Sequence, residues 1–300
     1  MTLNEEVISK NIKTLNLPID GVNTFSFEAY LPDVGGIFDP LGKEGLFYLT
    51  ARVMKRGSAR FPLYRDVVFE EESNGAHIGI DVKKEFITFR VHAPSRNLGK
   101  SLILLEDIFH SPMIRESDFQ KEKQSILSEI HALENDPVDF TSLKFREQVY
   151  NGTQFGAPIM GTRSSIESIN LQDVQRAVQW IQHSKRIVLM LGDSQAIKIY
   201  HAGNSALLSS ADLGNIDLTT SSRFSQNLNL VEDSPTLNIQ LLKRDLEQAL
   251  LFVGLHSVGV RDQDYWVAQV FTAILGSGFG SLLMANVREK HSLAYQVVAR

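Results

Sequence analysis

The order strand, loop, helix and glycine occurs twice in this chain of 300 residues, and it constrains the fold more than any other feature. The first copy has a predicted strand at 24–30, a loop at 32–42, a helix at 44–56 and then Gly57. The second has a strand at 249–255, a loop at 258–263, a helix at 264–275 and a glycine turn at 276–280. Such a weak internal repeat predicts two similar domains. The second copy stops soon after its helix and a strand at 294–300, so we expect the second domain to be incomplete.

Strands and helices also alternate between the two copies. Strands are predicted at 77–82, 86–92 and 186–191, and helices at 98–109, 117–135, 140–150 and 168–181. Ser117 and Gln120 have the spacing of a capping box at one helix start, and Asn170 is a predicted cap of another. This interleaving predicts an α+β fold. A stretch rich in Ser, Asn and Thr separates the copies, so we expect an N-terminal domain at 1–205, a linker at 206–232 and a second domain beginning within 233–300.

Composition excludes several classes of protein. Hydrophobic residues make up 43% of the chain and charged residues 22%, as in ordinary globular proteins. Without cysteine there is no disulfide framework, no cysteine zinc cluster and no thiol nucleophile. The net charge of −5 argues against a nucleic-acid partner. Because no apolar run reaches the roughly 20 residues of a spanning helix and the first residues lack a basic, apolar signal, we expect a cytoplasmic protein that does not insert into membranes.

Three segments occur in an order that resembles a known family. They are 45–58, 122–130, and a C-terminal pair formed by the glycine turn 275–281 and Val287-Arg-Glu-Lys-His-Ser-Leu-Ala-Tyr-Gln-Val297. Together they resemble the insulinase/pitrilysin family of zinc metallopeptidases, which includes the mitochondrial processing peptidases. The resemblance implies α/β roll domains, each a mostly antiparallel sheet packed by helices. A phosphate loop is a poor alternative for the glycine turn, because no Lys-Ser/Thr pair follows it.

The zinc motif of this family is degenerate in the chain. The family has His-x-x-Glu-His on one helix, where two histidines bind zinc and the glutamate is the general base. The matching residues here are Tyr48-Leu49-Thr50-Ala51-Arg52, so Tyr48 and Arg52 replace the histidines and Ala51 replaces the glutamate. Only the distal ligand position keeps its residue, Glu129, with Glu122 at a second acidic position of the same helix. We therefore expect no catalytic residue and no bound metal.

The loss of a metal site leaves Glu129 in need of a partner. An arginine at position 52 places a fixed cation where the metal would lie, and a buried carboxylate without a counter-charge costs several kcal/mol. We therefore expect Arg52 to pair with Glu129. The alternative is that Glu129 faces solvent, as most helical glutamates do.

The segment near the C-terminus keeps the family's substrate-binding residues. By the resemblance, Arg288 and Tyr295 would bind the backbone of a peptide substrate. The alternative is a solvated helical arginine and a core tyrosine. His291 and Ser292 depart from the family pattern, which commonly has Arg and Gly there. The strand at 76–81 matches the edge to which family substrates add.

These features together favour a non-catalytic subunit of an insulinase-family heterodimer. Such a subunit would contribute Arg288 and Tyr295 to the zinc site of a catalytic partner and help to bind unfolded peptides. It would need no cofactor of its own, and zinc is expected only in the partner. Two alternatives stay open: an active zinc metalloendopeptidase with a degenerate motif, and a structural subunit of a larger assembly. The length corresponds to one family domain and roughly a third of another, so we expect a fragment or a truncated gene.

Overall fold

The computed structural model describes most of the chain and divides it into two compact units. The described residues are 4–9, 12–202, 239–255 and 257–299, and the units are 1–250 and 251–300. The predicted linker 206–232 lies outside the described residues, as do the domain limits at 205 and 233, so these boundaries stay predictions. Within the described ranges, no helix combines the length and the apolar character that a membrane crossing requires.

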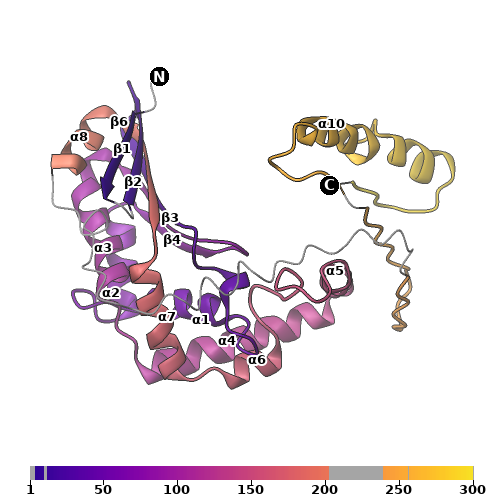
Figure 1. Ribbon diagram of the computed structural model, residues 1–300, viewed down its shortest axis with the longest axis horizontal. Helices are drawn as coiled ribbons and strands as arrows, with labels where there is room; N and C mark the ends of the chain where they lie inside the picture. Colours follow the sequence, from indigo (N-terminus) through magenta and orange to yellow (C-terminus); the bar gives the residue numbers. More distant parts are fainter. Residues whose placement is uncertain (1–3, 10–11, 203–238, 256, 300) are drawn as a thin grey trace. The chain divides into compact units, whose positions relative to one another are not determined.

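The first unit is built on one six-stranded sheet in the order β1-β2-β6-β3-β5-β4 (Figure 1). Its strands are β1 Asn4–Ser9, β2 Ile12–Ile19, β3 Thr24–Leu31, β4 His77–Val82, β5 Ile87–Pro94 and β6 Arg186–Asp193. Neighbouring strands run antiparallel except for β2 and β6, which are parallel. The sheet is therefore mixed and mostly antiparallel, and the predicted α+β class is confirmed for this unit.

The described part of this unit also contains helices, some of which pack against one face of the sheet while others pack on those helices. They are α1 Leu46–Met54, α2 Tyr64–Ser73, α3 Leu98–His110, α4 Glu116–Asn135, α5 Pro137–Val149, α6 Arg163–Ser168, α7 Leu171–His183 and α8 Ser194–Ala202. Alternate residues of β3, from Phe25 to Leu31, are buried on that face, as the period of two in a strand requires. α1, α3 and α8 contact the sheet directly, and α7 and α4 pack against α1.

The helix ends show which local predictions were correct. Asn170 caps α7, because its side chain accepts a hydrogen bond from the Asp173 amide at 3.0 Å. The capping box predicted at Ser117 is wrong, because α4 begins at Glu116 and Arg115 is its N-cap without a side-chain cap bond. The extended backbone of Arg115 places Ser117 inside the first turn, where its hydroxyl cannot act as the cap.

The second unit keeps the predicted helix but not the predicted strands. α10 spans Tyr265–Gly276, and a π-helix follows at Met284–Lys290. The described residues of 249–255 and 294–300 form no strand. A strand needs a neighbour for its main-chain N–H and C=O groups, and the described part of this unit contains no strand to pair with. Its apolar side chains are correspondingly exposed, as at Trp266, which is 74% exposed.

Candidate functional site

The degenerate motif lies on α1, and the start of this helix is fixed by a buried carboxylate. The side chain of Asp39 accepts hydrogen bonds from the amides of Gly45 at 2.7 Å and Phe47 at 2.9 Å. Gly45 has a φ of 92°, and a Cβ atom there would lie 2.6 Å from the Met160 carbonyl oxygen. Glycine is therefore required at this position, both for its positive φ and for the close approach of the Met160 backbone.

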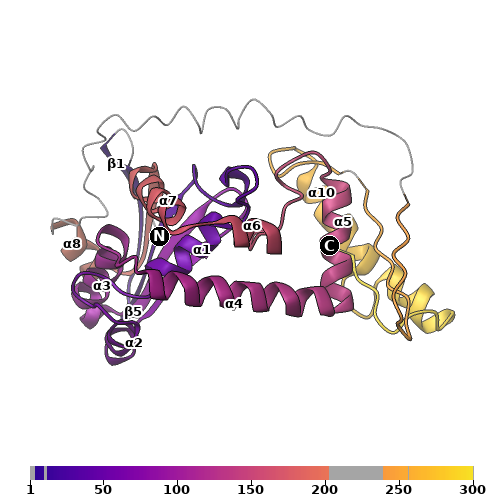
Figure 2. The ribbon, with the colours of Figure 1, turned by 90° about the horizontal axis from the view of Figure 1, so that it is seen from below.

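One face of α1 is buried and the opposite side faces α4. Leu46, Leu49 and Val53 are fully or almost fully buried in the core. Tyr48 and Arg52 are spaced by one turn and so lie on the same side of the helix. Figure 2 shows α4 running as a long helix beside α1. Tyr48 and Arg52, the two positions that the resemblance matches to zinc-binding histidines, thus lie on one side of α1, and α4 packs against this helix.

Arg52 reaches across to α4 and contacts three side chains. Its Nη1 lies 2.5 Å from Glu129 Oε1, its Nε lies 2.5 Å from Glu122 Oε2, and its Nη2 donates to Ser125 Oγ at 3.0 Å. Ser125 in turn donates to Glu129 at 3.1 Å. The predicted pairing of Arg52 with Glu129 is therefore confirmed, and it is part of a larger cluster than the sequence indicated.

A second arginine completes the cluster. Arg56 pairs with the other oxygen of Glu122, and its guanidinium lies 4.4 Å from the centre of the Tyr64 ring. Glu122 is 1% exposed and is held by both arginines, whereas Glu129 is more open. The cluster contains two cations and two carboxylates and is electrically neutral. Burial lowers the pKa of Arg52, but hydrogen bonds to Glu129 and Glu122 outweigh this effect and raise the pKa above its ordinary value.

The residues present do not fit a zinc ion. A guanidinium cannot lose its proton in a protein and has no lone pair for a metal, and it occupies the carboxylate oxygens that a metal would need. Ala51 carries no group that accepts a proton. In the described part of the chain, no three His, Cys, Asp or Glu side chains gather in a way that could hold a metal ion. The cluster can join α1 to α4, but it supplies no hydrolytic group.

The two predicted substrate-binding residues lie together in the second unit. Arg288 belongs to the π-helix, and its guanidinium carbon lies 5.2 Å from the centre of the Tyr295 ring. Tyr295 is 84% exposed. It is therefore not a core tyrosine, which was the alternative to a substrate-binding role. Ser292 has a φ of 50°, in the left-handed region that favours glycine. The half-buried Arg288 and the exposed Tyr295 thus form a cation–π contact at the end of a tight turn.

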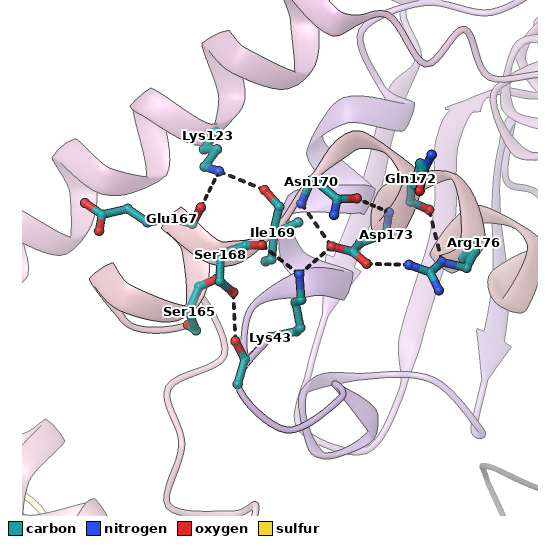
Figure 3. Close-up of polar contacts among 11 residues, drawn as sticks. Lys43, Lys123, Ser165, Glu167, Ser168, Ile169, Asn170, Gln172, Asp173 and Arg176 are labelled. Atoms are coloured by element: carbon teal, nitrogen blue, oxygen red, sulfur yellow. Dashed lines mark hydrogen bonds and ion pairs between the residues drawn. The ribbon is translucent and has the colours of Figure 1, made fainter.

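Sequence reasoning missed a polar site between α4, α6 and α7, which Figure 3 shows in detail. Lys123 of α4 donates to the carbonyl oxygens of Glu167 and Ile169, both at 2.8 Å. Lys43 donates to the Ser168 carbonyl at 2.7 Å and pairs with Asp173 at 2.6 Å. These lysines bind the carbonyls at the end of α6, which no helical amide can satisfy. The adjoining groove of about 510 Å³ is therefore lined by groups that serve the fold.

A pH dependence is expected from Asp39. Burial raises its pKa to about 7, against the hydrogen bonds from Phe47 and Gly45, which lower it. The folded chain then holds a proton that the unfolded chain releases above its ordinary carboxyl pKa, so stability falls as the pH rises from about 4 to about 7. We expect the Asp39→Asn variant to lack this fall. Urea unfolding of both proteins across the range measures it, and parallel pH profiles would contradict the assignment.

Comparisons with known proteins agree with the arrangement of the chain. A family model described as insulinase (peptidase family M16) matches residues 29–163, and one described as the peptidase M16 inactive domain matches residues 221–300. An uncharacterized zinc protease of Rickettsia bellii is 26% identical over 95% of this chain and 66% of its own length. The non-peptidase homolog YmxG of Helicobacter pylori is 24% identical over 89% of this chain and 60% of its own length.

A solved structure shares the fold. The crystal structure of a peptidase M16 inactive domain from Pseudomonas fluorescens superposes with a TM-score of 0.74 and 17% identity, covering 99% of this chain and 70% of that one. The chain thus spans about two thirds of the curated relatives that it matches, and these relatives include proteins named as zinc proteases and a protein named as a non-peptidase.

Proposed function

Because this chain belongs to the insulinase family of peptidases (family M16), we propose that it is a non-catalytic member that binds unfolded peptides and serves a catalytic family member as a partner subunit. The observation that carries this proposal is the guanidinium of Arg52, which bonds both Glu122 and Glu129. The family's hydrolysis needs two histidines, a proton acceptor and a metal at this place. Here a permanent cation replaces them.

The same ion-pair cluster supports a structural role for the residues at the degenerate zinc motif. Arg52 on α1 and Arg56 just after it form ion pairs with Glu122 and Glu129 on α4, so the four charges neutralise one another. An arginine fork binds carboxylates in a fixed geometry, so it holds α1 and α4 in register as a metal would. The family fold is thereby preserved without zinc, and zinc is needed only in the partner.

Peptide binding is supported by groups that the loss of catalysis leaves intact. Tyr295 is exposed and Arg288 lies half-buried beside it, so a phenol and a cation are available to a peptide carbonyl or carboxylate. In the first unit, β4 is the edge strand of the sheet at the end opposite β1, and it contacts α1. A sheet edge offers main-chain hydrogen bonds to an extended peptide of any sequence. These features suit a subunit that binds unfolded peptides broadly.

The proposal is tested by binding and by cleavage in one assay series. A fluorescent unfolded peptide is titrated with the full chain, first alone and then with an insulinase-family protein that has an intact His-x-x-Glu-His motif. We expect binding without cleavage by the chain alone, and faster cleavage when both proteins are present. Arg288→Ala should weaken this effect by about tenfold, the loss of one charge-assisted hydrogen bond.

Arg261→Ala is the matched control, because it removes an exposed arginine of the same unit outside the Arg288–Tyr295 pair. It should bind and stimulate as the unsubstituted chain does. Cleavage by the chain alone, or equal effects of the two substitutions, would contradict the proposal.

A further inference from the structure

The outer edge of β4 is not uniformly open. Ile78 pairs with Val91 in the antiparallel ladder between β4 and β5, and Ile80 pairs with Phe89. Main-chain groups of an antiparallel strand point alternately toward and away from the neighbouring strand. The N–H and C=O of Ile78 are bound by side chains from outside the sheet, so they point away from β5. The groups of Ile80 and Val82 follow the same alternation and point outward too.

Two side chains hold the main chain of Ile78. Glu71 Oε1 accepts the hydrogen bond of the Ile78 amide at 2.7 Å. Lys55 Nζ donates to the Ile78 carbonyl oxygen and pairs with Glu71 Oε2 at 3.2 Å. Lys55 is the C-cap residue of α1, and Glu71 lies in the last turn of α2. We call this closed set of three residues, Lys55, Glu71 and Ile78, the edge clip.

The clip uses the groups that a peptide would use. A peptide added to β4 as a further strand must donate to one outward carbonyl and accept from one outward amide at each alternate residue. At Ile78 a carboxylate and an ammonium already make both bonds. Hydrogen bonds to charged groups are about twice as strong as those between neutral groups. A neutral peptide backbone therefore competes poorly for Ile78.

The next outward position differs. In the described part of the structure, no side chain makes a hydrogen bond to the main-chain N–H or C=O of Ile80 or Val82. Asp81, on the other face of the strand, pairs with Arg90 at 3.0 Å instead. The edge thus changes along β4 from a closed part at Ile78 to an open part at Ile80 and Val82.

We propose that Lys55 and Glu71 close the first part of the β4 edge, so that an extended peptide pairs with Ile80 and Val82 and reaches Ile78 only when the clip opens. This inference rests on the proposed peptide-binding function and adds a limit to the length of strand that the edge accepts. Side chains that cover or charge a free edge are a general protection against unwanted strand pairing. Here the protection lies at the end of α1, the helix that carries Tyr48 and Arg52. It also determines which residues of β4 a peptide can pair with.

The test compares a clip variant with a charge-matched control. The clip variant carries Lys55→Met and Glu71→Met, which remove both bonds to Ile78. The control carries Lys144→Met and Glu147→Met, which remove another Lys–Glu pair on α5, 2.7 Å apart. An unfolded peptide of about ten residues is titrated with each full chain. Two further main-chain hydrogen bonds should tighten binding by about tenfold in the clip variant, with no change in the control.

Amide hydrogen exchange gives a second readout that needs no peptide. In the unsubstituted chain the Ile78 amide should be protected although it faces away from the sheet, whereas the Ile80 amide should exchange fast. The clip variant should lose protection at Ile78 and keep it at Gly79, which shows that the sheet is intact. Fast exchange at Ile78 in the unsubstituted chain would overturn the proposal.

Peptide affinity that is equal in the clip variant and the unsubstituted chain would overturn it as well. Failure of every form to bind peptide would instead refute the proposed function, and the selecting role of the clip with it, while Ile78 exchange still reports whether the clip forms.

Discussion

Replacing Arg52 with alanine is expected to lower the free energy of unfolding by about 2–4 kcal/mol, because it leaves charges unpaired at the interface of α1 and α4. Arg52 neutralises Glu129 and shares Glu122 with Arg56. Glu122 is 1% exposed, so water cannot replace the lost partner there. Arg56 stays and keeps part of the pairing, and the partial exposure of Arg52 screens some of its charge. The expected loss is therefore smaller than for a fully buried pair.

The measurement is urea unfolding followed by circular dichroism. Arg60→Ala is the control, since it removes the same charge from an exposed side chain that lies 3.8 Å from Asp107. An exposed pair of this kind contributes at most about 1 kcal/mol. Equal losses in the two variants would mean that the Arg52 cluster contributes no more than a surface ion pair, and that α1 and α4 are held by apolar packing alone.

Restoring the family motif is expected to create a zinc site. The variant carries Tyr48→His, Ala51→Glu and Arg52→His. It removes the fixed cation and supplies two imidazoles one helical turn apart, facing Glu129, which Arg52 already reaches at 2.5 Å. Zinc affinity should rise by more than about 100-fold over the unsubstituted chain, because the loss of even one second-shell group costs a zinc site 10–100-fold.

Calorimetric titration with zinc measures this gain. Two controls separate its causes: Glu129→Gln added to the three substitutions should abolish the site, and the pair Tyr48→His and Arg52→His alone should bind zinc with Ala51 still in place. A restored motif that binds zinc no better than the unsubstituted chain would show that positions 48, 52 and 129 do not converge as the family alignment requires.

The local patterns of the sequence predicted the parts of the fold that carry this site. Apolar spacing predicts the helix at 44–56, and the capping pattern at Ser117 with the stop at Pro137 predicts the helix at 117–135, although the cap itself is not formed. The pairing of Arg52 with Glu129 was predicted from charge and from the family resemblance, since neither residue type alone specifies a partner 77 positions away. The roles of Arg56 and Ser125 were missed, because nothing in their immediate sequence indicates which helix lies opposite.

Other elements could not be predicted, for physical reasons that differ. β2 was missed because its buried face carries Thr14 and Asn16 and because Pro18 interrupts the strand pattern. The strand expected at 249–255 has the apolar composition of a strand but no strand beside it in the described residues. The contacts of Lys43 and Lys123 join segments far apart in the sequence, and only the packed helices bring them together.

We propose that ion pairing between Arg52 and the glutamates of α4 has replaced zinc at this site. The most direct measurement is the zinc content of the full, unsubstituted chain after incubation with excess zinc and desalting, with peptide hydrolysis measured on the same sample. We expect zinc far below one ion per chain and no hydrolysis above the rate of the peptide alone. One zinc ion per chain, with hydrolysis that a chelator removes and added zinc restores, would contradict it.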